Sequence, residues 1–431
     1  MAGPDRERPR LAQGATRLSA LAAMTTGRGP LRALSALCIL ALAAPLFWMQ
    51  LTFVLSERAL ARGPLEALAW NPHRAEFLAS AAELAADQAK TEADREKARR
   101  LARRALLAGP LENRGLLVLA LDADRRGLQP AAAAMMTALG ARTFRNIQVQ
   151  LWLAQNTLLA QDYPAGFLHL DAAMRREPAL SRVAYPVLAV ALQDPAAVKP
   201  MADRLRAGPA WRETFLPWLV RQDGVAPEAE ALFMALRGGP GSATEPEVEG
   251  LVTLLLASDD PQTAHAAWLK FLPAGAGRES GAPYDGGFRG LPGAPPFNWR
   301  LASDDGVTAD LERAMDGRPA LHVQYSVARR HVLAEQLLLL PPGAYRLAGE
   351  GLVEAGEAPA RLSWRVSCAG GDGAFVEAPL VGAQGGWRAF SAAIDIPSTG
   401  CAAQQLRLVN DGQDSFATAD AWVSQLRIEP R

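Results

Sequence analysis

Two tryptophans in the C-terminal part of the chain each precede an arginine, a combination that could bind a sugar. Trp299 lies in the segment PPFNWRL, and Trp387 lies in GGWRAF, where Arg388 follows it. An exposed indole offers an apolar face to a pyranose ring, and a guanidinium offers hydrogen-bond donors to the hydroxyl groups. Trp299, Trp387 and Arg388 are therefore candidate glycan contacts. The interpretation we favour for both indoles is a core role, Trp299 where the chain enters a domain and Trp387 at the start of a strand.

Carboxylates that could perform acid–base chemistry occur in two short polar segments. Asp304 adjoins Asp305, and the segment NDGQD spans 410–414. A glycoside hydrolase would need two carboxyl groups about 5 to 10 Å apart across a cleft, and spacing along the chain does not establish this. We expect both segments to be polar turns between strands. A calcium ion held by Asp411 and Asp414 is the alternative.

The rest of the chain has no recognisable catalytic or metal-binding motif. His73, His169 and His265 are isolated from one another and lack the spacing of a zinc site. The sequence contains no GxSxG nucleophile elbow, no Walker loop and no GxGxxG dinucleotide fingerprint. We therefore expect that the protein is not an enzyme and that it uses no cofactor and no metal. A polysaccharide hydrolase or lyase is the alternative from the enzyme class.

The three cysteines fall in two different settings. Cys38 lies in an apolar segment, whereas Cys368 and Cys401 lie near the C-terminus at a spacing that suits neither a zinc knuckle nor a CxxC redox pair. Alternation with Trp364 and Val366 puts Cys368 on the inward face of a predicted strand. We predict a Cys368–Cys401 disulfide, which an oxidising compartment would permit. Two buried free thiols are the alternative.

The overall composition allows substantial hydrophobic cores and gives the chain no net formal charge. With 431 residues, of which 49% are hydrophobic, the chain has room for two or three domains. Its 45 basic residues balance 45 acidic residues. The densest basic segment, 95–104, also contains Glu96 and has apolar residues at helical spacing, which is typical of a solvated helix face. We therefore expect no nucleic-acid partner.

The range 33–55 has no charged residue and predicts a membrane anchor. As a helix it would be roughly 35 Å long, enough to cross a bilayer. The range 1–32 holds six arginines and two acidic residues, so we expect a basic cytoplasmic segment there and the bulk of the chain in the periplasm, on a bacterial inner membrane. A cleaved signal peptide is the alternative, although the apolar run continues past the small residues at 41–44.

The range 64–272 is rich in alanine and leucine at helical spacing and contains an internal repeat. Small residues seven positions apart recur at Ala98 and Ala105, at Ala131 and Ala138, and at Gly166 and Ala173. The three units begin 33 and 35 residues apart. We expect stacked helix pairs that approach closely at these small residues, with Pro110 and Pro178 ending two of the units.

This repeat resembles a degenerate tetratricopeptide array, whose period is 34 residues. In the best unit, Leu153 and Ala154 match the large-then-small pair of the first helix, and Asp162 and Tyr163 match the turn into the second. The match is good over about a hundred residues and weak over the rest of the range. The resemblance implies a scaffold that binds protein partners. Another kind of α-helical stack is the alternative.

After the helical range the periodicity of the sequence changes. The range 273–296 is half glycine and proline and predicts a linker. In 297–431, segments such as ALHVQYSV and RLSWRVSC alternate apolar and polar residues, which predicts seven or eight strands in an antiparallel β-sandwich. The segment QLLLLPPGAYRLAGEG predicts two strands joined by a turn at its prolines.

The order of these strands resembles the jelly rolls of carbohydrate-binding modules and galactose-binding domains. The expected architecture is thus a multidomain α plus β protein with one transmembrane helix, a tetratricopeptide-like solenoid and a jelly-roll sandwich. By analogy, it implies a periplasmic scaffold that recruits proteins and contacts polysaccharide in envelope or exopolysaccharide assembly or export. A purely protein-binding adaptor is the alternative.

Overall fold

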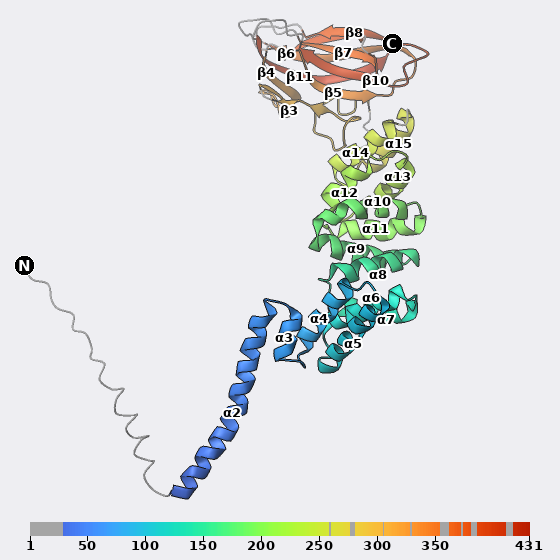
Figure 1. The fold of residues 1–431 in the computed structure, drawn as a ribbon. Coiled ribbons are helices and arrows are strands. Elements are labelled where there is room, and N and C mark those ends of the chain that lie inside the picture. The colour runs from blue at the N-terminus through green and yellow to red at the C-terminus, as the bar shows by residue number, and fades with distance from the viewer. Residues whose placement is uncertain are drawn as a thin grey trace, which may run out of the picture. The chain divides into compact units, whose positions relative to one another are not determined.

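The structure is a computed structural model that forms two compact units, residues 1–143 and residues 144–431. It describes residues 29–257, 260–275, 281–304, 306–327, 330–353, 362–371, 374–380, 386–410 and 417–431. Each unit is treated by itself below, with the labels of Figure 1.

The first unit begins with α2 (Gly29–Leu60), which contains the whole range 33–55. Among the described helices, this is the one that is long and apolar enough to cross a membrane, over Ile39–Leu60. Its last turn is part of a folded core, since Ala59 is buried against Ala67 and Phe77. The helix is thereby fixed to the rest of the first unit.

The short helix α3 and two helix pairs complete the first unit. Helix α3 spans Pro64–Trp70, and the pairs are α4 (Ala75–Asp87) with α5 (Glu92–Ala108) and α6 (Asn113–Arg125) with α7 (Gln129–Arg142). Ala98 and Ala102 of α5 are buried against Ala82 of α4 and Val118 of α6, so the small residues lie where helices touch. Arg99, also buried, bridges α5 to Asp122 of α6 at 2.9 Å.

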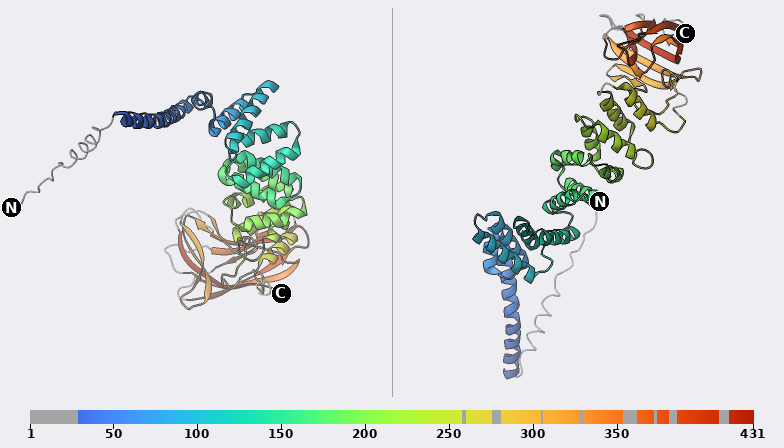
Figure 2. Two further views of the ribbon diagram at one scale, coloured as in Figure 1. Left: turned by 90° about the horizontal axis from the view of Figure 1, so that it is seen from below. Right: turned by 90° about the vertical axis from the view of Figure 1, so that its right-hand side faces the viewer.

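The second unit continues with four more helix pairs, which follow one another toward the sandwich (Figures 1 and 2). The elements are α8 (Ile147–Leu159), α9 (Tyr163–Arg176), the short 3₁₀ helix η1 (Pro178–Leu180), α10 (Ser181–Ala191), α11 (Pro195–Arg206), α12 (Arg212–Leu219), α13 (Ala226–Ala235), α14 (Glu245–Leu256) and α15 (Pro261–Phe271). Side chains cap several N-termini: Asn146 accepts from the amide of Val149, and Asp162 accepts from the amide of Ala165.

The repeat predicted from the sequence falls on the second helices of three successive pairs, α5, α7 and α9. Its small residues are buried in α5 and α9, but Ala131 of α7 is exposed, so its predicted place at a helix contact is wrong. At Gly166 a Cβ atom would come within 2.5 Å of Leu158, so glycine allows α9 to lie directly on α8. The predicted role of Gly166 as a close-approach position agrees with this contact.

The C-terminal part is an antiparallel sandwich, which confirms the predicted fold class, although its described residues form eleven strands where the sequence predicted seven or eight. One sheet has the order β1-β5-β10-β7-β8, and the other has the order β2-β3-β4-β11-β6-β9. Their bounds are β1 (Arg300–Leu301), β2 (Ser303–Asp304), β3 (Val307–Arg313), β4 (Pro319–Val327), β5 (His331–Leu338), β6 (Gly343–Val353), β7 (Leu362–Cys368), β8 (Ala374–Pro379), β9 (Arg388–Ile396), β10 (Gln404–Asn410) and β11 (Ala417–Pro430). Inward residues predicted by alternation, such as Val323, Trp364 and Val366, are fully buried between the sheets.

The described part of the Gly/Pro-rich range, from residue 281 onward, contains neither helix nor regular strand and packs against both neighbours. Trp268 of α15 donates its indole N–H to the carbonyl of Ala294 at 2.8 Å, and its ring meets Tyr284 edge to face. On the sandwich side, Ala282 pairs with Ile428 of β11. The carboxylate of Asp285 accepts hydrogen bonds from three backbone amides, those of residues 289–291. The segment therefore joins α15 to the sandwich through buried contacts, while the domain boundaries drawn from the sequence stay predictions.

Candidate functional site

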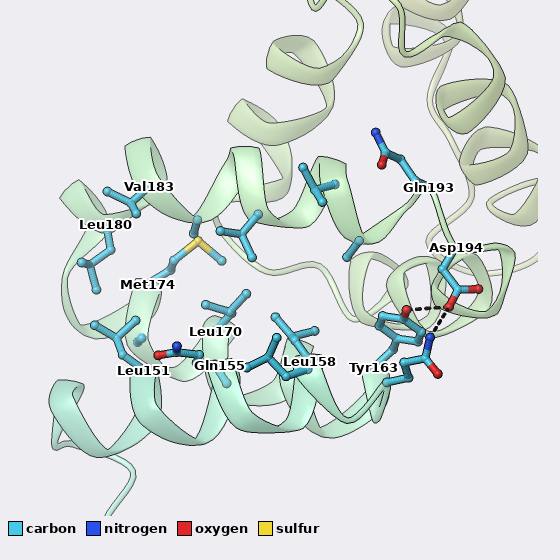
Figure 3. A pocket seen from close by; sticks show the side chains of 18 of the residues that line it. Leu151, Gln155, Leu158, Tyr163, Leu170, Met174, Leu180, Val183, Gln193 and Asp194 are labelled. Atoms are coloured by element: carbon cyan, nitrogen blue, oxygen red, sulfur yellow. Dashed lines mark hydrogen bonds between the residues drawn. The ribbon is translucent and has the colours of Figure 1, made fainter. Parts of the chain in front are cut away.

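A large apolar groove runs between α8 and α10, with α9 as its floor (Figure 3). Its volume is about 1010 Å³. One wall is formed by α8, through Leu151, Gln155, Leu158 and Leu159. The opposite wall is formed by α10, through Val183, Val187 and Val190. Both walls thus present side chains at the spacing of successive helical turns.

Several of these wall residues are exposed although they are apolar. The exposed fractions are 76% for Leu159, 69% for Val183 and 64% for Val190. The floor is well packed, since Leu170, Ala173 and Met174 of α9 are buried. A contiguous exposed apolar patch of this kind is uncommon on the surface of a soluble protein and is typical of an interaction site.

One end of the groove is polar. The hydroxyl of Tyr163 donates to the carboxylate of Asp194 at 2.6 Å, and Asp194 also accepts from the amide of Ala196 at 2.9 Å. The hydrogen bond from Tyr163, followed by that from Ala196, holds the pKa of Asp194 below its usual value. Asp194 is therefore an anion that caps α11 and borders the groove. Figure 3 shows Tyr163, Gln193 and Asp194 at this end, and Leu151, Leu180 and Val183 at the other.

The sequence contains a signal for this groove that the periodicity argument did not use. After Ser181 and Arg182, the segment that forms α10 is apolar on every side, yet only its Ala184, Tyr185 and Leu188 face the buried core. A helix that is apolar all round requires cover on all its faces. Val183, Val187 and Val190 lack that cover within the described chain.

Trp299 occupies a core position and does not contact solvent as a glycan ligand would. Its side chain is 7% exposed, and its ring lies 5.3 Å from that of Phe288 and 5.7 Å from that of Trp364. Its indole N–H donates to the carbonyl of Asp285 at 3.1 Å. Trp299 is therefore a core residue that fixes the entry of the chain into the sandwich, the role that the sequence favoured over glycan contact.

Trp387 lies beside the outer face of the six-stranded sheet, and Arg388, the next residue, points the other way by alternation. Arg388 is exposed and begins β9, where it pairs with Gly351 of β6. Trp387 is partly buried, and the guanidinium of Arg318 covers its ring at 4.6 Å. Alternation along β9 and β6 places Trp387 next to Leu352, on the outer side of the sheet.

Trp422, which the sequence argument did not single out, lies on the same outer face as Leu352 and Trp387. Trp422 of β11 pairs with Leu352 on one side and with His322 of β4 on the other. The rings of Trp422 and His322 are stacked with their centres 3.8 Å apart. His322 also contacts the carboxylate of Asp420 at 2.8 Å. The row His322, Trp422, Leu352 and Trp387 thus combines two indoles with polar neighbours.

Comparisons with known proteins found similar solved structures of carbohydrate-binding modules. No family model matches the chain, and no curated protein matches it. Among solved structures, the carbohydrate-binding module TmCBM61 in complex with beta-1,4-galactotriose is 17% identical, with a TM-score of 0.24, over 36% of this chain and 97% of that one. The CBM22-1 xylan-binding domain of Paenibacillus barcinonensis Xyn10C is 18% identical, with a TM-score of 0.23, over 31% of this chain and 85% of that one. Because these TM-scores are low, the fold of the sandwich is established by its own strand pairings.

The predicted disulfide is present. Cys368 and Cys401 are bonded, with their Cα atoms 5.1 Å apart, and Gln404 of β10 pairs with Cys368 of β7. The bond therefore joins the end of β7 to the approach of β10. Cys38 lies in α2.

Those histidines and carboxylates considered from the sequence that the structure describes do not gather into a site. His169 contacts Gln150 at 2.8 Å, and His265 packs against Trp268; burial lowers the pKa of both imidazoles. Asp304 belongs to β2, whereas Asp305, Asp411 and Asp414 lie outside the described residues. No group of three metal-binding side chains occurs in the part of the chain that the structure describes.

Proposed function

We propose that the chain is a membrane-anchored scaffold without catalytic activity, and that it binds an apolar helical segment of a partner protein in the groove between α8 and α10. The observation that carries this proposal is the row of exposed Val183, Val187 and Val190 facing Leu151, Leu158 and Leu159 across a buried floor. An amphipathic helix binds such a groove through side chains at positions i, i+4 and i+7.

The dimensions of the groove favour a helical segment. At about 1.5 Å per residue, the walls 151–159 and 183–190 extend for roughly 10 to 12 Å, which is two turns of a helix. A single sugar or metal ion would not cover apolar walls of this length. The equal intervals between the starts of α6 (Asn113), α8 (Ile147) and α10 (Ser181) support the further proposal that the array is tetratricopeptide-like, a class of scaffold that offers such surfaces to proteins.

The setting we propose is the periplasmic side of a bacterial inner membrane, in envelope or exopolysaccharide assembly or export. The apolar helix α2 supports a membrane anchor, and the arginines of 1–32 favour a cytoplasmic N-terminus. The disulfide supports an oxidising compartment for the sandwich.

Site-specific photo-crosslinking in native membranes tests the groove. A photoreactive phenylalanine analogue at Val187 should give a defined adduct whose linked peptide is amphipathic. The same analogue at Leu107, an exposed apolar residue on α5, is the matched control and should give no such adduct. Identical products from both positions, or no product from Val187, would contradict the proposal.

Contact with polysaccharide through the sandwich is a second candidate function. It is favoured by the row on the outer face of the six-stranded sheet, where Trp422 and Trp387 flank Leu352. Sugar rings stack on indoles, and Asp420 with its partner Gln324 supplies hydrogen-bonding groups nearby. Binding of the full-length chain to a glycan array, lost in Trp422→Ala and Trp387→Ala, would support this contact. A Trp422→Ala variant that binds every glycan as the wild type does would exclude it, and the scaffold role would stand.

A further inference from the structure

The groove between α8 and α10 has charges of opposite sign at its two ends. Asp194 lies beside Tyr163 and Gln193 at the end where α8 and α10 finish (Figure 3). Asp162, the N-cap of α9, precedes Tyr163 at the same end. Arg182 lies at the other end, immediately before Val183 of the α10 wall, and Arg176 ends α9 there. Glu177 follows Arg176 and offsets one of these positive charges. Arg145, which precedes α8, adds a further positive charge at this end.

The backbone dipoles of the helices do not create this polarity. α8 and α10 point their C-termini toward the Asp194 end, while α9 and α11 point their N-termini toward it, so their partial charges largely cancel. Arg176, Arg182 and Asp162 are exposed, so their charges act at the rim of the groove. The side chains therefore decide the sign of the field along the groove.

We infer that the segment bound in this groove is an amphipathic helix that runs antiparallel to α8 and α10. Its N-terminal, basic end lies beside Asp162 and Asp194, and its C-terminal, acidic end lies beside Arg176 and Arg182. This inference rests on the proposed function, because it describes the partner of the same groove. A helix carries partial positive charge at its N-terminus and partial negative charge at its C-terminus, so its own dipole favours this direction. Basic and acidic side chains at the matching ends favour it further.

The probe that tests the direction is a synthetic peptide of known charge pattern. It is a 15-residue helix with leucines along one face, alanines elsewhere, two lysines in the first turn and two glutamates in the last. It carries one activated cysteine, at either the N-terminus or the C-terminus. The protein is the full-length chain in lipid nanodiscs, with Cys38→Ser and either Gln193→Cys or Val183→Cys. Empty nanodiscs measure the binding of the peptide to lipid.

We expect the peptide with the N-terminal cysteine to couple to Gln193→Cys at least tenfold faster than to Val183→Cys, and the C-terminal version to show the reverse preference. Equal rates at both positions, or the opposite preference, would overturn the inferred direction while leaving the groove as a binding site. Failure of both peptides to couple at either position, with no binding beyond that of empty nanodiscs, would overturn the proposed function as well.

A charge reversal in the protein tests the polarity separately. In Arg176→Glu/Arg182→Glu, the same peptide should bind about three- to tenfold more weakly, the effect expected of two exposed ion pairs. A peptide with lysines and glutamates exchanged should gain affinity for this variant by a similar factor. Unchanged affinity for both peptides would show that the rim charges do not orient the bound helix.

Discussion

Replacement of Trp268 by alanine should destabilise the second unit strongly. The side chain is 1% exposed, its indole N–H donates to Ala294 at 2.8 Å, and its ring contacts Tyr284 at 5.0 Å and Phe297 at 5.7 Å. Truncation of a buried tryptophan to alanine lowers the free energy of unfolding by about 3 to 5 kcal/mol. This figure includes the cost of leaving the carbonyl of Ala294 without a hydrogen-bond donor. At about 2 to 3 °C per kcal/mol for a unit of this size, the melting temperature should fall by roughly 6 to 15 °C.

Thermal unfolding of the full-length chain in detergent, followed by far-ultraviolet circular dichroism, measures this shift. Trp268→Phe keeps an aromatic ring and loses the N–H donor, so it should cost only about 1 to 2 kcal/mol. Trp70→Ala is the control, because Trp70 is 46% exposed at the end of α3. A melting temperature for Trp268→Ala within 2 °C, roughly 1 kcal/mol, of that of Trp70→Ala would refute the conclusion that α15 and the sandwich are joined by a buried contact.

Three further perturbations follow from other contacts. Arg212→Met should cost about 3 to 5 kcal/mol in urea unfolding, because Glu247, paired with Arg212 at 2.7 Å, would lose its buried counterion; a cost under 1 kcal/mol would contradict this. Burial lowers the pKa of His265 in the folded state, so the stability contributed by its neutral imidazole is complete above the pKa of the unfolded state, near 6.5, and is lost as the pH falls below that value. His265→Gln should therefore reduce the slope of melting temperature against pH between about 7.5 and 5.5. Parallel slopes for the variant and the wild type would contradict this. Cys368→Ser/Cys401→Ser should lower the free energy of unfolding by about 2 to 4 kcal/mol, and an unchanged urea midpoint would contradict a structural role for the bond.

The parts of the fold that depend on local pattern were predictable from the sequence. Alanine spacing indicated the helix pairs because small residues such as Ala98 and Ala105 must lie where helices touch. Alternation indicated the inward faces of strands because successive side chains point to opposite sides, as Trp364 and Val366 show. Both rules act over a few residues, so a single sequence contains the information.

The parts that depend on distant contacts were not predictable in the same way. The glycine and proline content of 273–296 indicated the absence of helix and strand, but the burial of Tyr284 depends on Trp268 of α15. The row of Trp422 and Leu352 depends on the order of strands in the sheet, which local alternation does not specify.

The groove was missed for a related reason. Valines recur through α10, and periodicity alone does not say which of its faces the neighbouring helices leave uncovered. Trp299 illustrates the opposite case, since its position at the entry of the chain into the strands favoured a core role, and the sandwich core does enclose it.

The affinity of an amphipathic helical peptide for the full-length chain in nanodiscs, measured by fluorescence anisotropy, tests the central claim most directly. Val187→Asp places a carboxylate in the apolar wall and should weaken binding at least tenfold, since desolvating that charge costs well over 1.4 kcal/mol. Leu107→Asp makes the equivalent change on exposed α5 and should leave the affinity unchanged. Equal affinities for the wild type and Val187→Asp would contradict the assignment of the groove between α8 and α10 as the partner site.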